Sequence, residues 1–286
     1  MSRLPTSEDI AACTSVLLDL SVIFREFWDA CVLIGGWVPY FVLSRSGAGE
    51  TTVEHVGSLD LDLLVNVDKV GTDGYSAAAQ VMRSQDYEPG DNVFERIKVV
   101  GPPVTRRERR VRVHLLAPEQ SRRGESQRRR MQGGLQLQVI SDSDIALSHW
   151  FSHELVGRLP SGERHRSMVR VADEVACFVM KGTIFPRRDH YGDKDKDGYD
   201  LFMLLRSYDG GPIAFAERVR ELLHLGSVRR ALLNVRANFE KPEGLGSVWT
   251  VKYLAGARGA QSEQEIRETQ NEVAYVFGRF LNALPC

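Results

Sequence analysis

Two acidic residues separated by a single leucine could hold a metal ion. Residues 59–65 read LDLDLLV, so Asp60 and Asp62 alternate with leucines. Because successive side chains of a strand point to opposite faces, both carboxylates would lie on one face and the leucines on the other. Two carboxylates held so close repel each other unless a cation lies between them. Mg²⁺ (or Mn²⁺) commonly takes one or two carboxylates together with substrate phosphates, so the pair predicts a divalent-cation site.

A pair of glycines earlier in the chain could bind phosphates. Residues 31–34 predict a short apolar strand, Gly35 and Gly36 break it, and residues 37–43 predict a helix. Glycines at such a turn let a ligand approach the backbone, and the helix start offers free amides and partial positive charge. Ser58, just before the acidic strand, is a further nucleotide-binding candidate. Phosphates at the glycines and a metal ion at the aspartates would make a site for nucleotidyl transfer.

A second charged cluster could complete this site. Lys181 is a flexible cation that could meet triphosphate oxygens or developing charge. Asp197 and Asp200 are three residues apart, so they share one face of a predicted helix. One of them could act as a base or orient Lys181. The alternative is a network of surface ion pairs, including Lys196, with no chemical role.

Together these motifs resemble the nucleotidyltransferase superfamily, in which a strand, a Gly-Gly or Gly-Ser turn and a helix precede a strand with two aspartates. They are most similar to the AbiEii/AbiGii branch, the toxins of type IV toxin–antitoxin and phage-defence systems, over residues 30–205. The resemblance implies an Mg²⁺-dependent enzyme that uses an NTP. It implies catalytic roles for Asp60, Asp62, Lys181 and Asp197, and nucleotide contacts from Gly35, Gly36, Ser58 and Lys181.

One position departs from the superfamily signature. Many nucleotidyltransferases carry a third carboxylate on a later strand, and His114 stands in its place here. The imidazole could be a substitute base or ligand, although Mg²⁺ prefers oxygen. Alternatively, the third acid comes from elsewhere, for example Asp197, or catalysis is weak or lost.

An arginine-rich segment predicts an anionic partner. Between Arg106 and Arg130 the chain has ten arginines and three glutamates, whereas the whole chain has a formal charge of −1. Such a segment suits a phosphate backbone, although its arginines could also pair locally with acids. Because related toxins act on RNA or nucleotides, the resemblance implies an RNA acceptor, tRNA in particular, and a cognate antitoxin protein.

Three functions are compatible with these residues. The first is an enzyme that moves an NMP from an NTP to RNA as the toxin of a defence system. The second is a catalytically weak module that binds nucleotide or RNA. The third is a small-molecule nucleotidyltransferase similar to antibiotic-modifying enzymes.

Composition and patterning predict a two-part α+β protein. The 286 residues are 43% apolar and 26% charged, enough for one large or two modest cores. The absence of CxxC pairs, of a leader-like start and of a long apolar run predicts a cytoplasmic protein with no membrane segment. We expect a polymerase-beta-like mixed sheet with flanking helices in residues 1–140 and a mainly helical domain carrying Lys181 and Lys196 in residues 141–286.

Periodicity predicts the individual elements. Further helices are expected at 7–29, 76–84, 173–183, 195–207, 212–224, 227–239 and 262–283. Further strands are expected at 93–100, 110–116 and 135–140, with a hairpin of residues 149–159 and 165–171.

Overall fold

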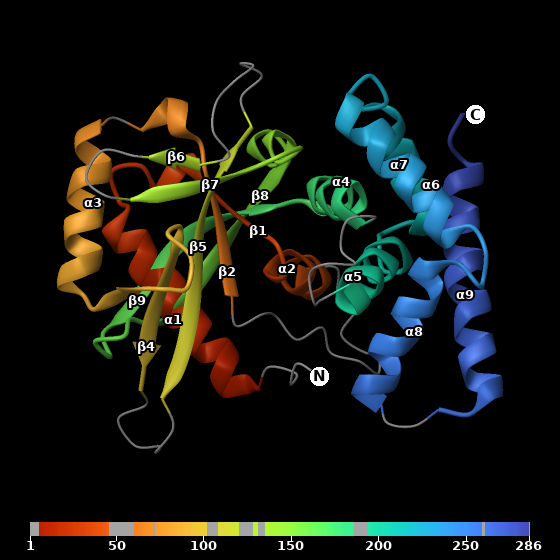
Figure 1. The fold of residues 1–286 in the computed structure, drawn as a ribbon, viewed down its shortest axis with the longest axis horizontal. Coiled ribbons are helices and arrows are strands. Elements are labelled where there is room, and N and C mark those ends of the chain that lie inside the picture. The colour runs from red at the N-terminus through yellow and green to blue at the C-terminus, as the bar shows by residue number, and fades with distance from the viewer. Residues whose placement is uncertain are drawn as a thin grey trace. The chain divides into compact units, whose positions relative to one another are not determined.

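A computed structural model describes residues 6–45, 60–70, 72–101, 108–119, 128–130, 135–185, 194–258 and 261–285. The chain divides into two compact units (Figure 1). The sheet unit comprises residues 6–41 and the described residues between 60 and 173. The helical unit comprises residues 42–45 and the described residues between 174 and 285.

One mixed sheet organises the sheet unit. Its strands run in the order β3-β4-β5-β2-β1-β9-β8, β7 pairs with the end of β5, and β6 pairs with β7. Strands β2 and β5 are parallel, as are β1 and β9, whereas β1–β2, β4–β5 and β8–β9 are antiparallel. The strands are β1 (Cys31–Ile34), β2 (Asp60–Val65), β3 (Tyr87–Pro89), β4 (Glu95–Val100), β5 (Arg109–Pro118), β6 (Arg128–Arg130), β7 (Gln136–Ile140), β8 (Trp150–Arg158) and β9 (Arg164–Ala172).

The apolar face of this sheet forms the core of the sheet unit. Helix α1 (Ser7–Ile23) packs against β2, β5, β8 and β9, and α3 (Thr72–Ser84) packs against α1 and β3. The alternating residues of the strands that face this side are apolar and buried: Leu33, Leu61, Leu63, Val111, Val113, Leu115, Leu155, Val169 and Val171. The intervening residues point to the opposite side, which we call the charged face because it carries Asp60, Asp62, Arg112 and His114. Its central residues Val32, Ile34, Leu64 and Ala172 are apolar and buried.

The first helix ends earlier than its periodicity predicts. We expected a helix over 7–29, but α1 ends at Ile23 and a short 3₁₀ turn covers Trp28–Ala30. The indole N–H of Trp28 donates to the carbonyl oxygen of Met168 on β9 at 2.8 Å. This contact with a residue far along the chain requires the backbone to leave the helix, so tertiary structure outweighs the local pattern.

The β8–β9 hairpin extends the sheet unit past the expected boundary near residue 140. Strand β9 pairs in parallel with β1 at Val171 and Leu33. The hairpin thereby covers the edge of β1 that β2 leaves unpaired, and the sheet unit reaches Asp173. The described residues from Glu174 onward are mainly helical, as expected.

The helical unit is built around aromatic side chains. Phe178, Phe215, Phe239, Phe277 and Phe280 are fully buried, and Phe178 contacts both Phe215 and Phe280 edge to face. The helices after β9 are α4 (Glu174–Ile184), α5 (Lys194–Arg206), α6 (Gly211–Arg220), α7 (Gly226–Phe239), α8 (Leu245–Arg258) and α9 (Glu263–Asn282).

Most other predicted elements are present with ends shifted by a few residues. Helix α2 (Trp37–Arg45) follows β1 as expected, whereas β3, β6 and α8 were not predicted. The α+β class is confirmed, with a mixed sheet followed by a helical part. Among the described residues, no helix combines the length and apolar character needed to cross a membrane.

Candidate active site

The two aspartates of β2 point to the charged face of the sheet. Asp60 and Asp62 alternate with Leu61 and Leu63, which are buried on the apolar face. The Asp60 and Asp62 side chains are 31% and 26% exposed. The alternation of acid and leucine in the sequence therefore becomes a pair of accessible carboxylates on one side of one strand.

Strand β5 places a basic side chain beside each carboxylate. In the parallel register, Asp60 pairs with Arg112 and Asp62 pairs with His114. The guanidinium Nη1 of Arg112 donates to Asp60 Oδ1 at 3.2 Å. His114 Nδ1 lies 2.8 Å from Asp62 Oδ1. The position at which a third carboxylate was expected thus holds an imidazole bonded to an acid of the pair.

A further acid, Glu95, lies beyond His114 on β4. Glu95 pairs directly with His114 across the two strands, and its Oε2 lies 3.6 Å from His114 Nε2. Its Oε1 is buried without a hydrogen bond and lies 3.9 Å from Arg112 Nε. We did not identify Glu95 from the sequence. Alternation within Glu95–Val100 could place the acid on a face of β4, but only the strand register brings it to His114.

The charges of this cluster perturb one another. Burial and the neighbouring charge of Asp62 raise the pKa of Asp60, and Arg112 and His114 oppose that rise. Burial alone would lower the pKa of His114, but the hydrogen bond to Asp62 and the surrounding carboxylates raise it above its ordinary value. The cluster therefore favours a cation beside Asp62.

Gly35 gives the Asp62 carboxylate the space it occupies. Gly35 has a φ of +74°, and a Cβ built on it would lie 2.0 Å from Asp62 Oδ2. The carbonyl of Gly35 accepts a hydrogen bond from the backbone N–H of Val38 at 3.2 Å, at the start of α2. The glycine turn and the acidic strand, which are far apart in the sequence, therefore meet directly.

Replacing Gly35 tests this close approach. Gly35→Ala combines a left-handed backbone with a clash against Asp62, so we expect a stability loss above the roughly 1–2 kcal/mol typical of such backbone strain. Gly162→Ala is the matched control, because Gly162 has a φ of +90° with open space around its Cβ. Denaturant unfolding of both variants measures the difference. Equal losses would contradict a specific requirement for space at Asp62.

Gly36 is the other predicted phosphate-binding residue of this turn. Gly36 follows Gly35 and directly precedes α2, which begins at Trp37. Ser58 lies outside the described residues. The part of the predicted phosphate site that the structure describes is thus the turn itself and the start of α2.

The donor set at Asp60 and Asp62 determines which cation fits. The repulsion between the two carboxylates, which raises the pKa of Asp60, is what a divalent cation would remove. Within the described part of the chain, no group of three or more His, Cys, Asp or Glu side chains is arranged to hold a metal ion. The oxygen donors of the pair have the chemistry of a hard ion such as Mg²⁺, which commonly takes one or two protein carboxylates together with substrate phosphates.

The second predicted cluster lies in the helical unit and forms a buried ion triad. Lys181 on α4 has its Nζ 2.5 Å from Asp197 Oδ1 and 2.8 Å from Asp200 Oδ2, both on α5. All three residues are buried. Burial lowers the pKa of Lys181, but the two carboxylates more than offset this and raise it overall. The lysine is therefore held as a cation between two acids.

This triad is more enclosed than the surface network considered as the alternative. Asp197 and Asp200 share one face of α5, as their spacing predicts, and that face is turned to Lys181. Lys196 lies on the same helix and is half-buried. In the helical unit, Lys181 thus links α4 to α5. Its predicted contact with nucleotide stays a prediction.

The described arginines between Arg106 and Arg130 pair with acids. Arg109 forms ion pairs with Glu8 and Asp9 of α1, with its Nε 2.7 Å from Asp9 Oδ1. Arg112 pairs with Asp60, and Arg110 lies 4.0 Å from Glu88. Residues 102–107, 120–127 and 131–134 lie outside the described residues, as do the side chains of 128–130.

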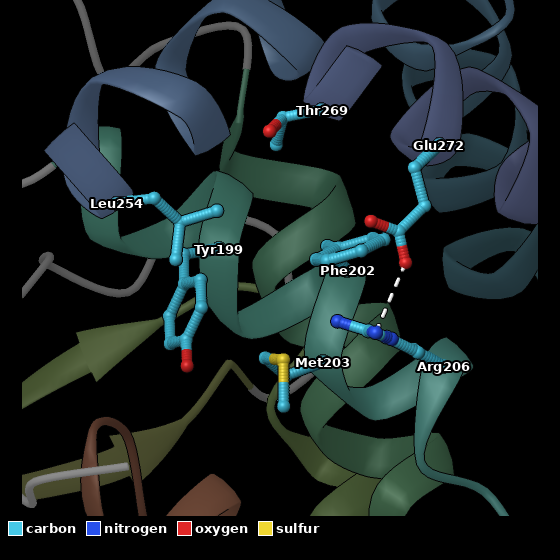
Figure 2. Close-up of a pocket in the computed structure, with 7 residues that line it drawn as sticks. All are labelled: Tyr199, Phe202, Met203, Arg206, Leu254, Thr269 and Glu272. Carbon is cyan, nitrogen blue, oxygen red and sulfur yellow. Dashed lines mark ion pairs between the residues drawn. The ribbon is translucent and has the colours of Figure 1, made fainter. Parts of the chain in front are cut away.

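A small cavity in the helical unit lies among α5, α8 and α9 (Figure 2). Its volume is about 30 Å³, room for roughly one or two water molecules. Arg206 and Glu272 form an ion pair of 3.1 Å at its side. The cavity is too small for a nucleotide. It is lined by Tyr199, Phe202, Met203, Arg206, Leu254, Thr269 and Glu272.

Comparison with known proteins gives one structural likeness. No family model matches the chain, and no curated protein matches it. Among solved structures, the chain is similar to an antigenic nucleotidyltransferase-like protein from Paracoccidioides brasiliensis. The sequence identity is 13%, the match covers 96% of this chain and 99% of that chain, and the TM-score is 0.38. The chemistry of the site therefore rests on its own residues.

Proposed function

We propose that the protein is a nucleotidyltransferase that moves an NMP from an NTP to the hydroxyl of an acceptor. One observation carries the proposal: Gly35, at a turn that leads into a helix, lies against Asp62 of an accessible carboxylate pair. A phosphate-binding turn beside two metal-binding carboxylates is the minimum that this chemistry needs.

The proposed reaction exchanges the phosphoanhydride bond between the α- and β-phosphates of the NTP for a phosphate ester bond to the acceptor. The acceptor oxygen forms a bond to the α-phosphorus, the bond to the pyrophosphate oxygen breaks, and the hydroxyl proton passes to a base. Asp60 and Asp62 would hold Mg²⁺, which when bound would neutralise phosphate charge. The turn at Gly35 and Gly36 would bind the phosphates through backbone amides.

The roles of Lys181 and Asp197 belong to the same proposal. The sequence motif suggests that Lys181 steadies the triphosphate and that Asp197 is the base or orients Lys181. In the structure both groups are engaged with each other. These roles therefore require the Lys181–Asp197 ion pair to open when the NTP binds. The stability experiment in the Discussion separates them from a structural role.

The acceptor and the biological setting rest on the sequence resemblance. The AbiEii-like motifs support an RNA acceptor, tRNA in particular, and a toxin role opposed by a cognate antitoxin. Measuring transfer of label from each α-³²P NTP to total tRNA with Mg²⁺ tests the proposal. We expect label on RNA with one preferred nucleotide, lost when EDTA removes the metal. Absence of label with every NTP would contradict the RNA-directed activity.

A specific observation favours a second function, a nucleotide-binding module without efficient catalysis. Arg112 and His114 already bond to Asp60 and Asp62, which reduces the need for a metal ion. Such a module would bind NTP with unchanged affinity in EDTA and would transfer nothing. Nucleotide affinity measured with and without Mg²⁺ distinguishes the two functions.

A further inference from the structure

The β8–β9 hairpin carries a row of arginines on the charged face of the sheet. Arg158 on β8 and Arg164, Arg166 and Arg170 on β9 alternate with residues that face α1. We call these four residues the arginine strip. Glu154 is the acid on the same face of the two strands, and it lies 3.3 Å from Arg166. The strip therefore keeps a net positive charge.

The strip shares its sheet face with the carboxylate pair. Asp62 pairs with Ile34 on β1. Strands β1 and β9 pair in parallel at Leu33 and Val171. The next residues, Ile34 and Ala172, therefore lie in the same row across the sheet as Asp62. On β8, Trp150 pairs with Ala172 of β9 and extends this row. Paired residues point to the same face, so Asp62, the strip and Trp150 all lie on the charged face.

Strand geometry sets the scale of this arrangement. Trp150 lies three strands from Asp62 in one row, a separation of about 14 Å at the usual spacing between strands. From that row the strip runs along the hairpin for about 26 Å to Arg158. The arginines therefore form a track along the hairpin that is separated from the carboxylates by the buried residues Ile34 and Ala172.

The chemistry of the strip matches a single-stranded polyanion. Arg166 is 71% exposed, and Arg158 and Arg164 are exposed as well. The guanidinium of Arg170 lies 4.4 Å from the ring of Trp150. Exposed guanidiniums bind phosphates, and an aromatic ring near the end of the track can stack on a base. Among the described residues of the hairpin, the large apolar side chains exposed on this face are those of Val156 and Met168, too few for insertion into a lipid surface.

We infer that the arginine strip binds the backbone of a single-stranded RNA acceptor through the exposed guanidiniums of the β8–β9 hairpin, with Trp150 at one end of the bound segment. This inference rests on the proposed function and gives its RNA acceptor a binding surface.

Direct binding tests the inference without any transfer reaction. A labelled twelve-nucleotide RNA is titrated in EDTA, without NTP, against Arg164→Gln/Arg166→Gln and the wild-type protein. We expect the dissociation constant to rise about tenfold at physiological salt. We also expect the slope of log affinity against log salt to fall by about 1.4, because each lost contact with a single strand contributes about 0.7.

The control is Arg229→Gln/Arg230→Gln, which removes the same charge from two exposed adjacent arginines of α7. We expect this variant to bind RNA as the wild type does. If both double variants lost RNA affinity equally, the loss would report only the net charge of the protein, and the inference would be overturned. Binding of anionic phospholipid vesicles in place of RNA would also overturn it.

The RNA-binding inference and the transferase proposal can succeed or fail independently of each other. If strip-dependent RNA binding is found but no NTP is used, the inference holds and the transferase proposal fails. If transfer to RNA occurs with the same RNA affinity in the strip variant, the transferase proposal holds and the inference is overturned.

Discussion

Asp60→Asn is expected to reduce nucleotidyl transfer by at least about 10³-fold while the protein remains folded. Loss of one preorganised group that stabilises developing charge typically costs about 10²–10³-fold, and loss of a metal ligand adds to that. Stability should not fall, because folding raises the pKa of Asp60. A carboxyl with a raised pKa destabilises the folded state at neutral pH, above its unfolded pKa, and an amide removes that cost.

The transfer assay and a thermal melt together measure this effect. Asp91→Asn is the matched control, because Asp91 is an exposed acid in the loop before β4 of the same unit. We expect Asp91→Asn to retain activity and melting temperature. Full turnover by Asp60→Asn would exclude the carboxylate pair as the metal site, whereas a large drop in melting temperature would make lost activity a consequence of unfolding.

Lys181→Met is expected to destabilise the helical unit by about 3–5 kcal/mol, the usual cost of removing one partner from a buried ion pair. The change leaves Asp197 and Asp200 facing each other without the cation that lies 2.5 and 2.8 Å from them. Methionine preserves most of the side-chain volume, so the loss reports on charge rather than on a cavity. Urea unfolding followed by circular dichroism measures the change.

An exposed ion pair in the same unit serves as the control for the effect of burial on the ion pairs of Lys181. Lys252→Met breaks the pair between Lys252 and Asp195, 2.9 Å apart, in which the lysine side chain is 65% exposed. An exposed pair contributes about 0–1 kcal/mol, so we expect a small effect. If Lys181→Met is as stable as Lys252→Met but loses NTP affinity, the contribution of Lys181 is to substrate binding rather than to the link between α4 and α5.

Local spacing was enough to predict the parts of the site that lie within one element. The alternation around Asp60 and Asp62 defined a strand face, and the three-residue spacing of Asp197 and Asp200 defined a helix face. Both depend only on the periodicity of a single strand or helix. The apolar face of β2, with Leu61 and Leu63 buried, follows from the same pattern.

Features that depend on partners distant in the sequence were not predictable in this way. Glu95 reaches His114 through the register of β4 on β5, and Arg112 reaches Asp60 through the register of β5 on β2. Local patterns do not specify which strands pair. Helix α8 was missed because Leu245–Arg258 contains two glycines, three β-branched residues and a weak amphipathic pattern.

The parallel pairing of β1 with β9 also bears on how the chain can be shortened and synthesised. Leu33 finds its partner only when Val171 is present, so the β1 edge stays open until most of the sheet unit has left the ribosome. A fragment ending at residue 140 would retain Asp60 and Asp62 but expose four buried, uncharged residues of β1 as an edge strand. Such edges template aggregation. Soluble fragments of the sheet unit therefore have to reach Asp173.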